Sequence, residues 1–169
     1  TGYMDDKDAI YGELWNDYGV DSLHGYGDYD DSMIFGYAVG KAIESFYNTN
    51  IKKGSNVVVQ AHEWQSGNAA LYVKKHLPAV GTIFTTHATS IGRSIASNGK
   101  PLYDYFEGYN GDQMAAELNV ESKQSVEKVT AANIDCFTTV SEITARECKQ
   151  LLERECDVIL ENGFEKDFV

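Results

Sequence analysis

Two polar clusters stand directly after two apolar runs of the sequence. The run "VVVQA" is followed by His62, Glu63 and Trp64, and the run "VGTIFTT" is followed by His87. Imidazole and carboxylate side chains can exchange protons with a substrate or hold its hydroxyl groups. If the two runs are neighbouring parallel strands, a carboxylate and two imidazoles face one crevice, because ligands bind beyond the carboxyl ends of the strands in an open parallel sheet.

A structural alternative stands beside each of these functional interpretations. A histidine at one strand end is more often a hydrogen-bonded structural residue than a catalyst, and only the two strand ends together bring the interpretations to equal weight. Arg93, six residues after His87, is either a surface charge, which is favoured, or a cation that meets phosphate at the head of a helix. Packing is favoured over sugar stacking for the aromatic candidates, which are Trp64, Tyr103, Tyr105 and Tyr109.

Several familiar catalytic motifs are absent from the sequence. The stretch "HEWQS" does not match the zincin pattern, because Ser66 occupies the place of the second zinc-binding histidine. The chain contains no G-x-S-x-G elbow, and neither a G-x-G-x-x-G motif nor a P-loop follows an apolar run. A hydrolase of the elbow type and a dinucleotide-dependent oxidoreductase therefore lose their main support, and the pattern indicates no metal site.

The composition fits one globular domain with an acidic surface. The chain has 169 residues, 43% of them hydrophobic, and a formal net charge of -12, so polyanions such as nucleic acid and anionic membranes are not expected as partners. No window reaches the roughly 20 apolar residues that a membrane span needs, which predicts a soluble protein. The three cysteines fit no zinc spacing and favour a reducing, cytoplasmic compartment.

The apolar pattern predicts alternating strands and helices. The first thirty residues indicate loops around one or two short elements, and Ser32 is expected to cap a helix that stops at "NTN". Further helices are expected in "SGNAALYVKKHLP", over residues 121–133 and after Ser141, and the strands in "NVVVQAHEW", "VGTIFTTH", "CFTTVS" and "DVILENG". This alternation predicts a doubly wound α/β fold with a mostly parallel, Rossmann-like sheet. The apolar positions of the Ser32 helix are Phe35, Val39, Ala42, Ile43, Phe46 and Tyr47.

Four strings of the chain resemble the glycogen synthases of the animal and fungal type, a family that also occurs in some bacteria. These strings are "AHEWQSG", "PAVGTIFTTHATSIGR", "FTTVSEITARECKQLL" and "ENGFEKDF", and the upstream "ELWNDYGVDS" and "DDSMIFGYAVGKAIESF" resemble the same family. The resemblance implies a GT-B glycosyltransferase with two Rossmann-like domains. Residues 1–169 are then a partial N-terminal, acceptor-side domain that lacks its first strand with the glycine-rich lysine loop, and the whole C-terminal donor-binding domain.

The same resemblance assigns roles to the polar clusters. Glu63 matches an acidic residue that binds sugar hydroxyls and His87 a histidine beside the transferred glucose, so these two are the candidate catalytic residues. Arg93 matches an arginine near the donor phosphates, and His62 and Trp64 shape the same substrate-binding loop. These roles fit retaining transfer, which develops positive charge on the sugar ring and negative charge on the leaving diphosphate. Neither a metal nor a cofactor other than the donor UDP-glucose is implied.

The resemblance implies that the full-length protein transfers glucose from UDP-glucose to the non-reducing end of an α-1,4-glucan such as glycogen, with retention. A homo-oligomer is expected for the full-length protein, and this chain alone is expected to be inactive. The alternatives are a starch-synthase-like enzyme that uses ADP-glucose, a sucrose-synthase-like enzyme, and a non-catalytic module that binds glucan or a partner protein.

Two departures from the family pattern are visible. Gln60 stands where many members have a histidine, and Ser122, Lys123 and Gln124 replace ring-bearing and basic residues in a helix that keeps Glu127. These changes, with the acidic composition, predict a bacterial member.

Overall fold

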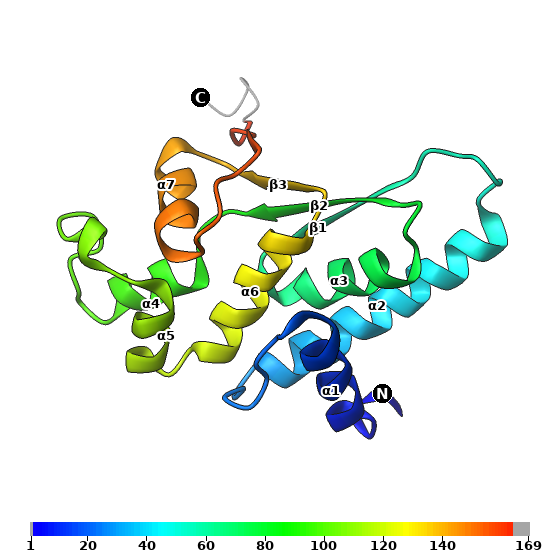
Figure 1. The fold of residues 1–169 in the computed structure, drawn as a ribbon, viewed down its shortest axis with the longest axis horizontal. Helices are drawn as coiled ribbons and strands as arrows, with labels where there is room; N and C mark the ends of the chain where they lie inside the picture. Colours follow the sequence, from blue (N-terminus) through cyan, green and yellow to red (C-terminus); the bar gives the residue numbers. More distant parts are fainter. Residues whose placement is uncertain (1, 164–169) are drawn as a thin grey trace.

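The computed structural model describes residues 2–163, whose strands form one parallel sheet (Figure 1). The strands are β1 (Val58–His62), β2 (Gly81–Thr86), β3 (Cys136–Thr139) and β4 (Val158–Ile159), and they lie in the order β1-β2-β3-β4. Every neighbouring pair is parallel. The structure therefore confirms the α/β class with a parallel sheet and fits a Rossmann-like domain. The last part of "ENGFEKDF", from position 164 onward, lies outside the described residues.

The first thirty residues contain more regular structure than the sequence predicts. Helix α1 (Lys7–Tyr18) runs for 12 residues and ends at Gly19, whose φ of 74° is the left-handed conformation of a helix C-cap. Its periodicity is weak because only Ile10 and Leu14 are buried. Helix α2 (Tyr29–Asn50) begins three residues before the predicted cap Ser32, since the ring of Tyr29 is fully buried and stacks on Trp64.

Helix α2 buries only part of the predicted face, since Ile43 and Tyr47 pack against the core while partly exposed, and its most deeply buried face is a different one. Along that face the buried residues are Met33, Ile34, Gly36 and Gly40, and helix α3 (Gly67–His76) lies against it (Figure 1). Glycines allow the two helices to approach closely: a Cβ at Gly36 would lie 2.9 Å from the Cβ of Asn68. Phe35 and Phe46 of the predicted apolar stripe are instead 61% and 60% exposed.

The remaining helices include the two that the sequence predicts over residues 121–133 and after Ser141. They are α4 (Ser90–Ser97), α5 (Gly111–Leu118), α6 (Glu121–Asn133) and α7 (Glu142–Leu151), with single 3-10 turns at Gly2–Met4, Trp64–Ser66 and Phe106–Gly108. Ser141 caps α7 as expected, because its side chain accepts a hydrogen bond from the main-chain N–H of Thr144. Among residues 2–163, no helix combines the length and the apolar character needed to cross a membrane.

The centre of the sheet is held by stacked aromatic rings and paired threonines. Phe84 of β2 and Phe137 of β3 are fully buried, and their ring centroids lie 5.9 Å apart. The hydroxyls of Thr85 and Thr138 are 2.7 Å apart across the same pair of strands. Cys148 is buried in the same core cluster as Phe84 and Phe137. Strands β2 and β3 are therefore joined by side-chain contacts as well as by their backbone ladder.

Candidate functional site

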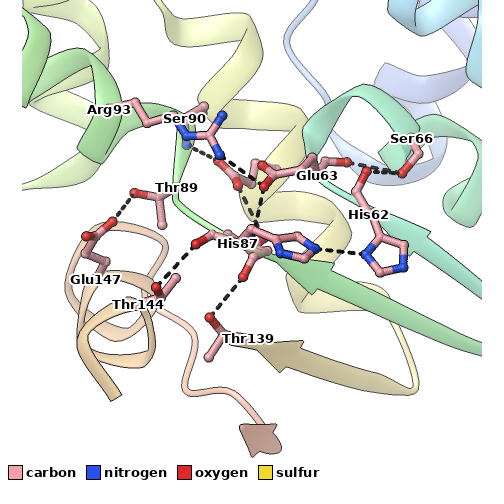
Figure 2. A network of polar contacts seen from close by, with 12 residues as sticks. His62, Glu63, Ser66, His87, Thr89, Ser90, Arg93, Thr139, Thr144 and Glu147 are labelled. Atoms are coloured by element: carbon pink, nitrogen blue, oxygen red, sulfur yellow. Dashed lines mark hydrogen bonds and ion pairs between the residues drawn. The ribbon is translucent and has the colours of Figure 1, made fainter. Parts of the chain in front are cut away.

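The parallel register of β1 and β2 brings the two predicted strand ends together. His62 of β1 pairs with Thr85 of β2, so His62 and His87 leave the sheet at the same edge. Nδ1 of His62 lies 3.0 Å from Nε2 of His87 (Figure 2). This hydrogen bond requires one ring nitrogen to donate and the other to accept. The expected shared edge of the two strands is therefore confirmed.

Glu63 sits at the turn where the chain leaves β1, and its backbone is strained. Its φ of 61° and ψ of 162° lie in a region that is populated almost only by glycine. The main-chain N–H of Glu63 still donates to the carbonyl of Thr85, at 2.9 Å, so the ladder between the strands extends one residue beyond β1. The turn then directs the Glu63 side chain toward the end of β2.

The Glu63 carboxylate links the two candidate elements of the site. Its Oε1 accepts hydrogen bonds from the main-chain N–H of His87, at 3.1 Å, and from the Arg93 guanidinium, at 3.2 Å (Figure 2). The Glu63 side chain is 19% exposed and that of Arg93 is 58% exposed. Because both bonds go to Oε1, Oε2 is available to accept from a ligand hydroxyl.

The structure therefore places an acceptor, two imidazoles and a cation within one small region. His62, Glu63 and His87 come from two strand ends, and Arg93 comes from the second turn of α4. A polar ligand with hydroxyl groups and a negative charge matches such an arrangement, because the carboxylate accepts from hydroxyls and the guanidinium binds oxyanions. Among residues 2–163, no three histidine, cysteine or acidic side chains gather as metal ligands.

Trp64 lies apart from this group. It is 5% exposed and stacks on Tyr29 with ring centroids 6.0 Å apart, inside the cluster formed with α1 and α2. Lys123 Nζ lies 4.9 Å from the centroid of the Trp64 ring. Trp64 thus anchors the loop after β1 in the core, as the packing alternative predicts, and a contact of its ring with substrate stays a prediction.

The candidate tyrosines divide between surface and core. Tyr109 is 8% exposed, whereas Tyr103 and Tyr105 are 61% and 62% exposed. The Tyr103 hydroxyl donates to Glu147 at 2.7 Å, and this bond to a carboxylate raises the pKa of Tyr103 to about 12. Packing is confirmed only for Tyr109.

Sequence reasoning missed two buried carboxylates behind the loop that carries His87. Glu127 of α6 is fully buried, and burial raises its pKa to about 7, although the hydrogen bond from the main-chain N–H of Ser90 opposes this shift. Glu147 of α7 is 4% exposed and accepts from the Thr89 hydroxyl at 3.0 Å. The available signal was an acidic residue on the apolar side of each amphipathic helix, where a solvated charge is not expected.

A parallel sheet with a polar site at its carboxyl edge is the arrangement of Rossmann-like ligand-binding domains. Comparison with known proteins identifies the family. The model of the family described as glycogen synthase matches residues 3–168. The chain belongs to the glycogen synthase family.

Individual relatives support this assignment. The chain is 37% identical over 138 residues to "Glycogen [starch] synthase" of Dictyostelium discoideum, covering 82% of this chain and 16% of that protein. It is 33% identical over 156 residues to the liver "Glycogen [starch] synthase" of Rattus norvegicus, covering 92% of this chain and 22% of the relative. It is 33% identical over 162 residues to "Glycogen [starch] synthase" of Neurospora crassa, covering 96% of this chain and 22% of that protein.

The chain spans about a fifth of the length of these curated relatives. All three relatives are eukaryotic, and they do not support the prediction of a bacterial member.

Proposed function

We propose that the full-length protein containing this chain is a retaining glycosyltransferase that moves glucose from UDP-glucose to the non-reducing end of an α-1,4-glucan. The observation that carries the proposal is the shared edge of β1 and β2, where Glu63 Oε1 accepts from both the His87 N–H and the Arg93 guanidinium. Family membership, together with relatives named "Glycogen [starch] synthase", supports the glucan acceptor.

The charges at this edge suit the charges of such a reaction. Breaking the bond to the leaving diphosphate places positive charge on the sugar ring and negative charge on the phosphate oxygens. Oε2 of Glu63 would accept from a sugar hydroxyl, and His87 would lie beside the sugar that is transferred. The Arg93 guanidinium, more than half exposed, would meet the diphosphate. Preorganised groups of this kind stabilise the transition state because they need no reorientation during reaction.

We propose further that residues 1–169 form part of the acceptor-side domain of a GT-B enzyme. The first strand of that domain and the donor-binding domain would then come from other parts of the parent protein, and this chain alone would not catalyse transfer. We also propose a cytoplasmic location and a homo-oligomer for the full-length protein, with UDP-glucose as the donor substrate and no separate cofactor.

The variant His87→Ala in the full-length protein tests the proposed chemistry. We expect kcat for glucan elongation to fall by about 100-fold or more, a loss typical of removing a group at the reacting centre, with little change in the thermal midpoint. The matched control is His24→Ala, because His24 is an exposed histidine whose side chain is bonded only to Asp21, at 3.1 Å. An unchanged rate for His87→Ala would remove His87 from the mechanism.

Donor comparison separates the alternatives. Faster elongation with ADP-glucose than with UDP-glucose would favour the starch-synthase-like alternative. Binding of glucan without transfer from either donor would favour the non-catalytic module.

A further inference from the structure

The loop that carries His87 is held from behind by two buried carboxylates on different helices. The loop joins β2 to α4 and has only three residues, His87, Ala88 and Thr89. Glu127 and Glu147 both lie under it and are 0% and 4% exposed. Neither carboxylate belongs to the surface that would meet substrate.

Glu127 contacts the loop at both of its ends. Its Oε2 accepts a hydrogen bond, at 2.7 Å, from the main-chain N–H of Ser90, the first residue of α4. Its Oε1 accepts a hydrogen bond, at 3.3 Å, from the hydroxyl of Thr86, the last residue of β2. One carboxylate thus spans the whole turn between the strand and the helix, with His87 in between.

Glu147 and two threonines complete the support. Glu147 Oε2 accepts from the hydroxyl of Thr89, and the same oxygen of Thr89 accepts from the N–H of Gly92 and caps α4. The hydroxyl of Thr144 donates to the carbonyl of His87 at 3.3 Å (Figure 2). Each end of the loop is therefore fixed by a side chain from α6 or α7.

Burying two carboxylates under the loop lowers the stability of the fold, so stability does not explain why they are there. A carboxylate removed from water loses favourable hydration, and a buried polar group is often replaceable by a well-packed apolar one without loss of stability. Glu127 also lies near the charge of Glu63, which disfavours its ionised form. A helix residue that only filled the core would not need to be acidic.

We infer that Glu127 is a positioning residue for the proposed transfer, fixing the main chain that presents His87 and Arg93 to the substrate, with Glu147 in the same role through Thr89. This inference rests on the proposed function. Glu127 acts through the loop and does not touch substrate. Its contribution is orientation, and a misplacement of about 1 Å at a reacting centre can lower a rate by about 100-fold.

Three variants of the full-length protein test the inference. Glu127→Ala leaves the Ser90 N–H without its acceptor, whereas Glu127→Gln keeps an oxygen for Ser90 and a polar group for Thr86. Gln124→Ala is the matched control, because Gln124 lies one turn earlier on α6, is 2% exposed, and donates to the carbonyl of Leu151 away from the loop.

We expect Glu127→Ala to lower kcat by about 10- to 100-fold with less than about threefold change in the KM for glucan. Glu127→Gln should restore kcat to within about threefold of the parent protein, and Gln124→Ala should leave kcat nearly unchanged. Equal kcat losses in Glu127→Ala and Gln124→Ala would overturn the inference, because they would reflect general loosening of α6. Failure of Glu127→Gln to restore kcat more than Glu127→Ala would overturn it as well.

Two further measurements keep the test decisive. If Glu127→Ala does not fold, Thr86→Val removes one of the two bonds at the loop; a kcat loss of about threefold or more supports the inference, and an unchanged kcat overturns it. Hydrogen–deuterium exchange of residues 85–94 gives a readout that needs no activity. Faster exchange there in Glu127→Ala than in Gln124→Ala supports the positioning role, and equal exchange contradicts it. Absence of transfer in the parent protein would instead reject the proposed function.

Discussion

Glu63 holds a backbone conformation that side-chain-bearing residues rarely adopt, with φ at 61° and ψ at 162°. Such a conformation costs about 1–3 kcal/mol and persists only when the surroundings enforce it. Here the ladder bond from the Glu63 N–H to Thr85 fixes Glu63 itself, and the packed ring of Trp64 fixes the next residue. The strain is what allows the carboxylate to face the N–H of His87, so it serves the site and weakens the fold.

This strain predicts an inverted order of stability at position 63. The Glu63→Gly variant should be more stable than the Glu63→Ala variant, with a free energy of unfolding about 1 kcal/mol higher, because glycine adopts positive φ without strain. Both variants should lose transfer, since both lack the carboxylate. Denaturation by urea measures the difference, and Glu13 in α1 is the control, where alanine should be the more stable replacement. Glycine less stable than alanine at both positions would contradict the strain.

The pKa of Glu127 predicts a pH dependence of stability. Burial raises this pKa from 4.5 to about 7, so between those values the folded state keeps a proton that the unfolded state releases. The stability from this protonated group is complete below about pH 4.5 and is lost as the pH rises toward about 7. Glu63 and Cys148 are the ionisable groups that face Glu127.

Glu127→Gln removes that titration. As the pH rises from about 5 to about 8, the parent protein should lose stability that Glu127→Gln keeps. The difference in free energy of unfolding, variant minus parent, should therefore increase by on the order of 2 kcal/mol. Urea denaturation at several pH values measures the gain. Parallel pH profiles of the two proteins would show that Glu127 does not titrate in this range.

At the residue scale, the sequence predicted which groups meet but not how they are held. The positions of His62, Glu63 and His87 followed from two apolar runs and the rule that parallel strands end at one edge. The positive φ of Glu63 depends on the turn after β1, and no glycine or asparagine marks that turn. The buried state of Glu127 depends on how α6 packs, which local pattern does not determine.

At the element scale, close helix packing explains why the sequence did not predict the most deeply buried face of α2. An apolar pattern highlights large side chains such as Phe46, whereas the closest contact of α2 with α3 uses Gly36 and Gly40, which carry no hydrophobic signal. The start of α2 was missed for a related reason, since Tyr29 joins the helix through its stacking on Trp64. Tertiary contacts from distant residues thus decided both features.

Two glycine-to-alanine changes within helices test this packing. Gly36→Ala should destabilise the protein by about 1–3 kcal/mol, because the new Cβ meets Asn68 and the main chain of Ala69. Gly12→Ala in α1 should stabilise it by about 0.5–1 kcal/mol, since no atom lies within 4 Å of the new Cβ and alanine favours helix. Thermal unfolding of both variants measures the contrast. Stabilisation by both would show that α2 and α3 can separate without loss.

At the scale of the whole molecule, the β1 edge of the described sheet leaves apolar surface uncovered. β1 forms an edge of the sheet among the described strands, and Val58 on it is 60% exposed. Beside it, α2 exposes Phe46, also 60% exposed. Between the helix and the strand lies an open groove of about 510 Å³. Its lining residues are Val39, Ala42, Ile43, Phe46, Tyr47, Ile51, Val57 and Val59.

An open strand edge beside an apolar groove favours association between chains, because both the unpaired main-chain groups and the apolar side chains gain partners. We therefore expect the 169-residue chain to self-associate as its concentration rises in sedimentation velocity experiments. Phe46→Lys should weaken that association by placing a charge in the groove. Ile143→Lys on α7 is the matched control, since Ile143 is 56% exposed and the change in charge is the same. Equal association of both variants would place the contact elsewhere on the surface, because a general effect of charge is shared by the two.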